Sequence, residues 1–210
     1  MRIATEALPF TLPLAGLALA LGITGSWPAG LVALLLSALL ALFFRIPHRR
    51  DPSDPRCVVA PANGRVLLVD EVEDPDLGGT CRRIVTFLSV FDVHVQRAPV
   101  AGEVIHTAFR PGRKVAAFRP EAAEVNECRL VVLRTEAGGL VGVRQIAGLL
   151  ARRTVGYRGV GERVARGDLL GLIKFGSRVD LLLPATYAIS ARRGQRLREG
   201  ETVVARSALP

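Results

Sequence analysis

The stretch Leu172-Ile-Lys-Phe-Gly-Ser-Arg-Val-Asp-Leu-Leu-Leu-Pro184 places a single Gly-Ser pair between two short, strongly apolar segments. Apolar runs of this length, bounded by turn residues, are typical of buried β-strands. Because Gly-Ser is a common turn sequence, the pattern predicts a change of direction at Gly176 and Ser177 between two strands. The fold around it should therefore be predominantly β.

Short segments rich in valine and separated by glycine continue through the chain from residue 51 onward. They predict strands at residues 65–69, 83–88, 93–97, 103–109, 129–135, 140–146, 169–174, 179–183 and 202–206. Turns such as Ala137-Gly-Gly139 separate them. We therefore expect a mainly β domain of sandwich or barrel type with hairpins like those of carrier domains, and an α+β chain overall.

Two turn segments share one pattern. Gly161-Glu-Arg-Val-Ala-Arg-Gly-Asp168 and Gly194-Gln-Arg-Leu-Arg-Glu-Gly-Glu201 both read GxR[VL]xxG[DE]. Each is expected to be a turn that leads into a strand, as in the β-sandwiches of biotinyl and lipoyl carrier domains, so the repeat concerns fold rather than function. Two similar hairpins and an internal duplication would both produce it.

Residues 8–44 contain no charged side chain, which is enough apolar length for a membrane-spanning segment. The break Gly22-Ile-Thr-Gly-Ser-Trp-Pro28 divides it into two runs, each slightly short of the roughly 20 residues that a straight crossing needs. A helical hairpin that dips into the bilayer, two short spans and one tilted span all fit this pattern. A cleavable signal peptide fits less well, because the apolar region is too long.

Basic residues follow the apolar segment, and a proline-rich linker, Asp51-Pro-Ser-Asp-Pro55, comes next. By the positive-inside rule these residues hold the downstream end in the cytoplasm. We therefore predict a membrane-anchoring helical hairpin over residues 1–50. A second domain over residues 51–210 would lie at the cytoplasmic face of the cell (inner) membrane. The basic residues are Arg45, His48, Arg49 and Arg50.

The formal net charge of +9 comes almost entirely from arginine and suits an anionic partner. Nucleic acid is disfavoured as that partner, because the chain has no zinc-finger, helix-turn-helix or RNA-binding signature and few aromatic residues. Lipid headgroups are the remaining candidate. Cys57, Cys81 and Cys128 are far apart and form no CxxC motif, so neither a metal site nor a disulfide framework is predicted.

The pair Gly176-Ser177 could do chemistry as well as turn the chain. A serine hydroxyl held against the preceding carbonyl can attack it, and glycine leaves that carbonyl unshielded. Elimination from the resulting ester, followed by hydrolysis of the dehydroalanine, would produce an N-terminal pyruvoyl group. Chain cleavage and cofactor synthesis would then be one event.

A second candidate site is Phe91-Asp-Val-His-Val-Gln-Arg-Ala-Pro-Val-Ala-Gly102. On a strand, Asp92 and His94 would share one face, and Arg97 follows. Histidine exchanges protons near neutral pH, and arginine can bind phosphate or carboxylate through two hydrogen bonds. A structural hydrogen bond and a catalytic pair both account for Asp92 and His94.

Four motifs in a fixed order resemble the short, bacterial or archaeal phosphatidylserine decarboxylases. They are APANGRV at residues 60–66, FDVHVQRAPVAG at 91–102, QIAGLLARR at 145–153 and KFGSRVDLLLP at 174–184. The hydrophobic N-terminal segment and Phe43-Phe-Arg-Ile-Pro47 match as well. The resemblance therefore covers nearly the whole chain.

This resemblance implies a pyruvoyl-dependent carboxy-lyase, made as a zymogen, that converts phosphatidylserine to phosphatidylethanolamine and CO₂ in phospholipid biosynthesis. Ser177 would cut the chain after Gly176, giving a β chain of residues 1–176 and an α chain of residues 177–210, and would become the covalent pyruvoyl cofactor. The substrate amine would form a Schiff base with it, and His94 would protonate the resulting carbanion. The implied partners are the phospholipid, the membrane and the two self-derived chains, and a homo-oligomer is compatible.

The chain departs from the family at the PADG motif. Asn63 stands where the family usually has an aspartate that assists self-cleavage through a histidine, and an amide cannot stabilise an imidazolium as a carboxylate does. Arg97 stands near the place of the second histidine of longer relatives. Asp92 and Asp180 are candidates to substitute for the missing charge.

Asn63 also motivates the leading alternative, an unprocessed membrane-anchored β-domain homologue with a binding or scaffolding role. A biotinyl or lipoyl carrier would need a lysine at the hairpin tip, but Lys174 precedes the Gly-Ser pair by two residues. A pyruvoyl decarboxylase for a soluble amino acid is a further alternative. The membrane segment and the basic surface favour a lipid substrate over it.

Overall fold

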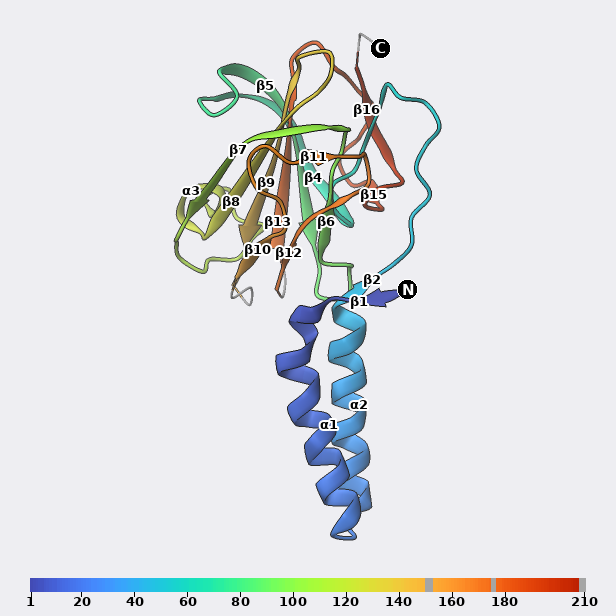
Figure 1. The fold of residues 1–210 in the computed structure, drawn as a ribbon. Helices are drawn as coiled ribbons and strands as arrows, with labels where there is room; N and C mark the ends of the chain where they lie inside the picture. The colour runs from blue at the N-terminus through green and yellow to red at the C-terminus, as the bar shows by residue number, and fades with distance from the viewer. Residues whose placement is uncertain (150–152, 175–176, 208–210) are drawn as a thin grey trace. The chain divides into compact units, whose positions relative to one another are not determined.

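The computed structural model describes residues 1–149, 153–174 and 177–207, and its chain divides into two compact units, Met1–His48 and Arg49–Pro210. The first unit is mainly helical and the second is mainly β (Figure 1). The helices are η1 (Thr5–Ala7), α1 (Leu8–Ile23), α2 (Trp27–Phe43) and α3 (Ala122–Val125). The strands are β1 (Arg2–Ile3), β2 (Arg45–Ile46), β3 (Cys57–Val59), β4 (Gly64–Asp74), β5 (Gly79–Leu88), β6 (Val95–Arg97), β7 (Gly102–Arg110), β8 (Cys128–Arg134), β9 (Leu140–Ala147), β10 (Thr154–Gly156), β11 (Arg163–Val164), β12 (Leu169–Ile173), β13 (Ser177–Pro184), β14 (Ala188–Ile189), β15 (Arg196–Leu197) and β16 (Val203–Arg206).

The first unit is a helical hairpin, as predicted (Figure 1). Helices α1 and α2 are joined at the predicted break, where Gly25 has φ of 81°. Between the helices, the Ser37 hydroxyl donates to the main-chain carbonyl of Thr11 at 3.0 Å. The helical stretch Thr5–Ile23 is long and apolar enough to cross a membrane by length and composition alone, whereas α2 is shorter.

The second unit is built on a curled antiparallel sheet that forms a half-barrel (Figure 1). Within the described residues this sheet has eight strands in the order β11-β7-β8-β9-β13-β5-β4-β15. Two smaller sheets, β10-β12-β6 and β14-β16-β3, complete the fold. The mainly β architecture predicted from the sequence is confirmed.

Strand β13 lies in the middle of the large sheet and pairs with β9 on one side and β5 on the other. Its alternate residues Val179, Leu181 and Leu183 are buried in the main hydrophobic core. A strand enclosed on both edges and packed on its faces must be apolar almost throughout, which is the pattern that the sequence shows. The core therefore fixes the position of Ser177, the first residue of β13.

The repeated turn pattern is one half of a larger structural repeat. In one copy the main-chain N–H of Gly200 donates to the carbonyl of Ala60. In the other copy the N–H of Gly167 donates to the carbonyl of Ala98, and both distances are 2.9 Å. Each copy begins with Ala-Pro-x-x-Gly, at residues 60–64 and 98–102, and the final glycine starts a long strand, β4 or β7. We call residues 60–66 with 194–201 the first copy and residues 98–104 with 161–168 the second copy.

Other main-chain bonds of the two copies also correspond. Val66 N–H donates to the Gln195 carbonyl as Val104 N–H donates to that of Glu162, both at 2.9 Å. The glycines of the turn pattern all have positive φ: Gly161, Gly167, Gly194 and Gly200. Such matching bonds and backbone conformations favour an internal duplication over two unrelated hairpins.

Candidate active site

Ser177 is fully buried, and its hydroxyl has no hydrogen-bond partner among the residues that the structure describes. A buried polar group without a partner destabilises the folded chain by about 1–3 kcal/mol, so such a hydroxyl calls for a functional explanation. A hydroxyl that no other group engages could attack the preceding carbonyl once a base takes its proton, as conversion of Ser177 to a pyruvoyl group would require. The residue therefore fits that group, while the predicted cleavage partner Gly176 lies outside the described residues.

A row of paired residues connects Ser177 with the Ala-Pro-x-x-Gly segment of the first copy. Ser177 pairs with Leu88 of β5, the strand that also pairs with β4. Gly64, which starts β4, approaches β5 so closely that a Cβ atom would lie 2.1 Å from the Phe87 carbonyl oxygen. With strands spaced about 4.8 Å apart, Gly64 lies roughly 10 Å from Ser177 at the same end of the sheet. Asn63 immediately precedes it.

His94 is fully buried and directly precedes β6. Its main-chain carbonyl accepts a hydrogen bond from the N–H of Ile173 at 3.1 Å, and Ile173 precedes Ser177 by four residues. The imidazole Nδ1 lies 2.8 Å from the main-chain carbonyl oxygen of Asp92. Because a carbonyl only accepts, Nδ1 carries the proton in this contact, which leaves Nε2 as the proton-accepting nitrogen of the neutral ring.

The predicted strand-face pairing of Asp92 with His94 is wrong. Strand β6 begins at Val95, and Asp92 lies in the turn before it. The Asp92 carboxylate accepts hydrogen bonds from the N–H and the hydroxyl of Ser89, at 2.9 and 2.7 Å, and pairs with Arg196 at 3.5 Å. Asp92 therefore orients the imidazole through its main-chain carbonyl rather than through its charge.

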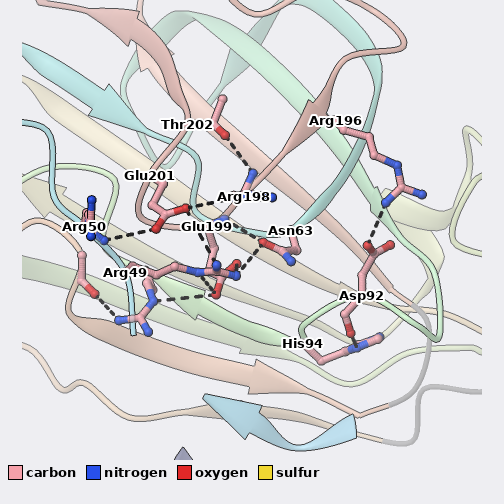
Figure 2. A network of polar contacts seen from close by, with 12 residues as sticks. Arg49, Arg50, Asn63, Asp92, His94, Arg196, Arg198, Glu199, Glu201 and Thr202 are labelled. Atoms are coloured by element: carbon pink, nitrogen blue, oxygen red, sulfur yellow. Dashed lines mark hydrogen bonds and ion pairs between the residues drawn. The ribbon is translucent and has the colours of Figure 1, made fainter. Parts of the chain in front are cut away.

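Asn63 belongs to a polar cluster with Arg49, Arg97 and Glu199, most of which Figure 2 shows. The side-chain oxygen of Asn63 accepts from the main-chain N–H of Glu199 at 2.8 Å and from Nη2 of Arg49 at 3.5 Å. Arg49 also binds the Glu199 carboxylate through two hydrogen bonds of 2.9 and 2.8 Å. Nε of Arg97 lies 4.0 Å from the same carboxylate. We call these four residues the Asn63–Glu199 cluster.

Burial dominates the electrostatics of this cluster. The Glu199 side chain is fully buried, and loss of solvation raises its pKa although Arg49 and Arg97 lower it. Burial likewise lowers the pKa of Arg97. The guanidinium of Arg97 is held further by a 2.7 Å hydrogen bond to the Gly167 carbonyl.

Asp180 is not brought to the side of Ser177. Its carboxylate is fully buried and accepts two hydrogen bonds from Arg178, at 2.6 and 2.8 Å. Because side chains alternate along a strand, Arg178 and Asp180 lie on the opposite face of β13 from Ser177. A cavity of about 1330 Å³ lies on that opposite face and is lined by Arg178. This cavity is therefore separate from the candidate site.

Glu199 is the site residue that sequence reasoning missed. It is separated from Asn63 by 136 positions, and only the pairing of β15 with β4 brings the two together. A signal was present in the repeat, because Glu199 occupies the position that Arg166 holds in the other turn segment. The charge at this position is reversed between the two.

Sequence comparison places this chain in a known family. The sequence profile described as phosphatidylserine decarboxylase matches residues 36–205, which is most of the chain. The chain belongs to the phosphatidylserine decarboxylase family. It is 44% identical over 205 residues to a protein of Symbiobacterium thermophilum named phosphatidylserine decarboxylase proenzyme, covering 97% of this chain and 95% of that one.

Other relatives of this family carry the same name. The Rhodococcus jostii protein is 48% identical over 202 residues, which cover 94% of this chain and 84% of the relative. The Mycobacterium tuberculosis protein is 46% identical over 196 residues, covering 91% and 84%. The family resemblance inferred from the four motifs is confirmed.

Proposed function

We propose that this chain is a self-processing phosphatidylserine decarboxylase that releases CO₂ from phosphatidylserine and forms phosphatidylethanolamine, with a pyruvoyl group made from Ser177. The observation that carries this proposal is the fully buried Ser177 hydroxyl, which has no partner among the described residues although it begins the central strand of the sheet. Family membership supports the same reaction.

Self-cleavage begins with transfer of the Ser177 hydroxyl proton to a base. The serine oxygen bonds to the carbonyl carbon of Gly176, the carbon–nitrogen bond breaks, and the amine of residue 177 is released beside the new ester. Loss of the Cα proton then expels the Gly176 carboxylate and leaves dehydroalanine. Its imine tautomer takes up water and releases ammonia, which leaves a pyruvoyl group on the α chain.

The pyruvoyl group supplies a carbonyl for the lipid amine and a sink for the electrons left behind by CO₂. His94 then delivers the proton that replaces the carboxyl group, acting from Nε2 as an imidazolium. The bond from Nδ1 to the Asp92 carbonyl keeps the ring in the orientation from which Nε2 donates. Arg97, which binds Gly167 and faces Glu199, supports the site by position.

The helical hairpin would hold the enzyme at its lipid substrate. Its apolar helices, followed by basic residues, support an anchor over residues 1–50 with the decarboxylase domain over residues 51–210 at the cytoplasmic face of the membrane. Cleavage after Gly176 would divide this domain into a β chain ending at 176 and an α chain starting at Ser177. Both chains would remain together, because β13 pairs with two β-chain strands.

Intact-mass analysis and a lipid assay test this proposal together. The purified chain should appear as two fragments, the smaller bearing an N-terminal pyruvoyl group, and should convert phosphatidylserine in vesicles to phosphatidylethanolamine. Ser177→Ala should stay one chain of 22.5 kDa without activity. Ser190→Ala, which changes an exposed serine of the same α chain, is the matched control and should behave like the native chain. A native chain that stays uncut and inactive would favour the unprocessed homologue instead.

A further inference from the structure

Glu199 carries a buried charge that the stability of the fold does not explain. It is fully buried in the tip of the turn between β15 and β16, and its carboxylate faces the two guanidiniums of Arg49 and Arg97. Both arginine side chains are largely buried, with 15% and 12% of their surface exposed. Burying a carboxylate is unfavourable, and well-packed apolar side chains would often serve stability equally well. Its presence here calls for another reason.

The second copy of the repeat shows what the scaffold alone requires. There Arg166 takes the place of Glu199, and its guanidinium binds Asp51 and the main-chain carbonyls of Asp54, before β3, and Cys57, at its start. Ala101 takes the place of Asn63 and has no polar side chain. The turn therefore folds without a carboxylate at the sixth position of the GxR[VL]xxG[DE] pattern, which is Glu199 or Arg166. It also folds without an amide at the position of Asn63 or Ala101. Both polar groups occur only in the copy next to Ser177.

Arg49 links the two residues of that copy. One of its nitrogen atoms, Nη2, lies 2.8 Å from the Glu199 carboxylate and 3.5 Å from the side-chain oxygen of Asn63. An aspartate at position 63 and a glutamate at position 199 would thus present their charges to the same guanidinium. The negative charge that Asn63 lacks is present on Glu199, which binds the same Arg49 guanidinium.

The charge matters if the base of self-cleavage is a neutral imidazole. Such a base becomes positively charged when it takes the Ser177 proton, and two poorly solvated guanidiniums nearby would oppose this unless a carboxylate compensates them. We propose that Glu199 is a positioning residue for self-cleavage, which supplies from the β15–β16 turn the negative charge that an aspartate at position 63 would carry. This inference rests on the proposed self-processing function.

A double-mutant cycle between positions 199 and 63 tests the inference. Each chain is synthesised in a pulse-labelled cell-free reaction with lipid vesicles, and the loss of the uncut chain is followed on a gel. Glu199→Gln keeps the shape but removes the charge, and should slow cleavage about 10- to 100-fold. Adding Asn63→Asp to Glu199→Gln should return most of that rate, because the charge reappears on the same guanidinium. A purely structural role would not be restored by a charge at another residue.

Glu201→Gln is the matched control, because Glu201 lies in the same turn but is 27% exposed and 3.8 Å from Arg49. It should cleave like the native chain. A Glu199→Gln chain that cleaves at the native rate would overturn the inference, and so would a slow one that Asn63→Asp fails to restore. If native cleavage itself is absent, the proposed function fails rather than the role of Glu199 alone.

Asn63→Asp in the otherwise native chain provides a second test that does not depend on the folding of Glu199→Gln. Since Glu199 already carries the charge, the added aspartate should accelerate cleavage less than about threefold. An acceleration of about tenfold or more would show that the native site lacks this charge, and would overturn the inference.

Discussion

The two copies of the strand-and-turn repeat share a backbone but differ in many side chains, and two of these differences concern the Asn63–Glu199 cluster. The first copy has Asn63 opposite Glu199, and the second has Ala101 opposite Arg166. Equivalent main-chain hydrogen bonds hold both copies together. Their common part is therefore sufficient for folding, so the turn itself requires neither the amide of Asn63 nor the carboxylate of Glu199.

The direction in which the two buried charges point supports this distinction. Arg166 binds main-chain carbonyls and Asp51, so its charge holds the segment before β3 against the domain. Glu199 instead binds Arg49 and faces Arg97, in the copy that adjoins Ser177. Arg166 of the second copy thus stabilises the packing of the chain, whereas Glu199 of the first copy brings charged side chains together near the candidate site.

The largest expected effect is a loss of stability on changing the glycine that both copies share at the start of a long strand. Gly64→Ala and Gly102→Ala should each destabilise the folded chain by about 3 kcal/mol or more, because a Cβ atom would lie 2.1 Å from the Phe87 carbonyl oxygen or 2.4 Å from that of Arg134. Thermal unfolding of the Ser177→Ala chain in detergent measures this. Gly159→Ala, where a Cβ would meet only a side-chain atom at 3.4 Å, is the control. A tolerated alanine at one of the two glycines would show that the copies are not equivalent scaffolds.

Arg166→Gln should lower the stability of the chain without changing its rate of self-cleavage. Loss of the Asp51 pair and of the bonds to the carbonyls of Asp54 and Cys57 should lower the free energy of unfolding by about 1–3 kcal/mol. Self-cleavage of the folded fraction should stay within about twofold of native, since Arg166 lies in the second copy. Unfolding curves and the pulse-labelled cleavage assay measure the two quantities. Slow cleavage in a fully folded Arg166→Gln chain would contradict the functional difference between the copies.

The pH dependence of the self-cleavage rate should reveal the ionisation of the Glu199 carboxylate. Burial raises its pKa above 4.5, so the cleavage rate should fall as the pH is lowered through this raised pKa and the carboxylate loses its charge. The charged groups around it are Arg49, Arg97, Glu201 and, beyond Arg97, Asp168. The inflection should disappear in Glu199→Gln, and its persistence there would assign it to another group.

The stability contribution of Glu199 should change with pH in the opposite sense. Because its pKa is higher in the folded chain than in the unfolded chain, the folded chain binds the proton more tightly. The ionised carboxylate therefore lowers stability above this raised pKa, and that loss is relieved as the pH falls. Comparing native and Glu199→Gln unfolding across this range would show a difference of this sign.

The smallest effect is expected where the second copy is given the amide of the first. Ala101 is exposed, so Ala101→Asn should change the free energy of unfolding by less than about 0.5 kcal/mol and leave cleavage unaltered. The same unfolding and cleavage assays measure both. An appreciable change in cleavage would mean that the second copy also contributes to the site.

Local patterns were sufficient to predict the long strands and the helical hairpin. The nine predicted strands correspond to β4–β9, β12, β13 and β16, because alternating or continuous apolar runs directly reflect burial. Most of the two- and three-residue strands, such as β11 and β15, escaped prediction, since so short a strand shows no periodicity. The strand limit at residue 93 was wrong for a related reason, because Asp92 binds Ser89 in a turn that apolar patterning cannot reveal.

The candidate site was only partly predictable. Ser177 and His94 were identified from motifs, and the structure buries both side chains. Asp180 was placed among the supporting residues because it is acidic and close in sequence, but alternation along β13 turns it away. Roles that depend on which face of a strand a side chain occupies require the exact register.

The sequence by itself determined the family, the helical hairpin, the β domain and the serine proposed to react, because each of these is written in contiguous residues. The tertiary structure alone decided that Ser177 has a buried hydroxyl without a partner in the described chain, and that Glu199 stands beside Asn63. Both depend on strand pairing between segments far apart in the chain. Desolvation and charge proximity arise only after such segments meet, and these physical effects make a common Gly-Ser sequence a candidate for self-cleavage.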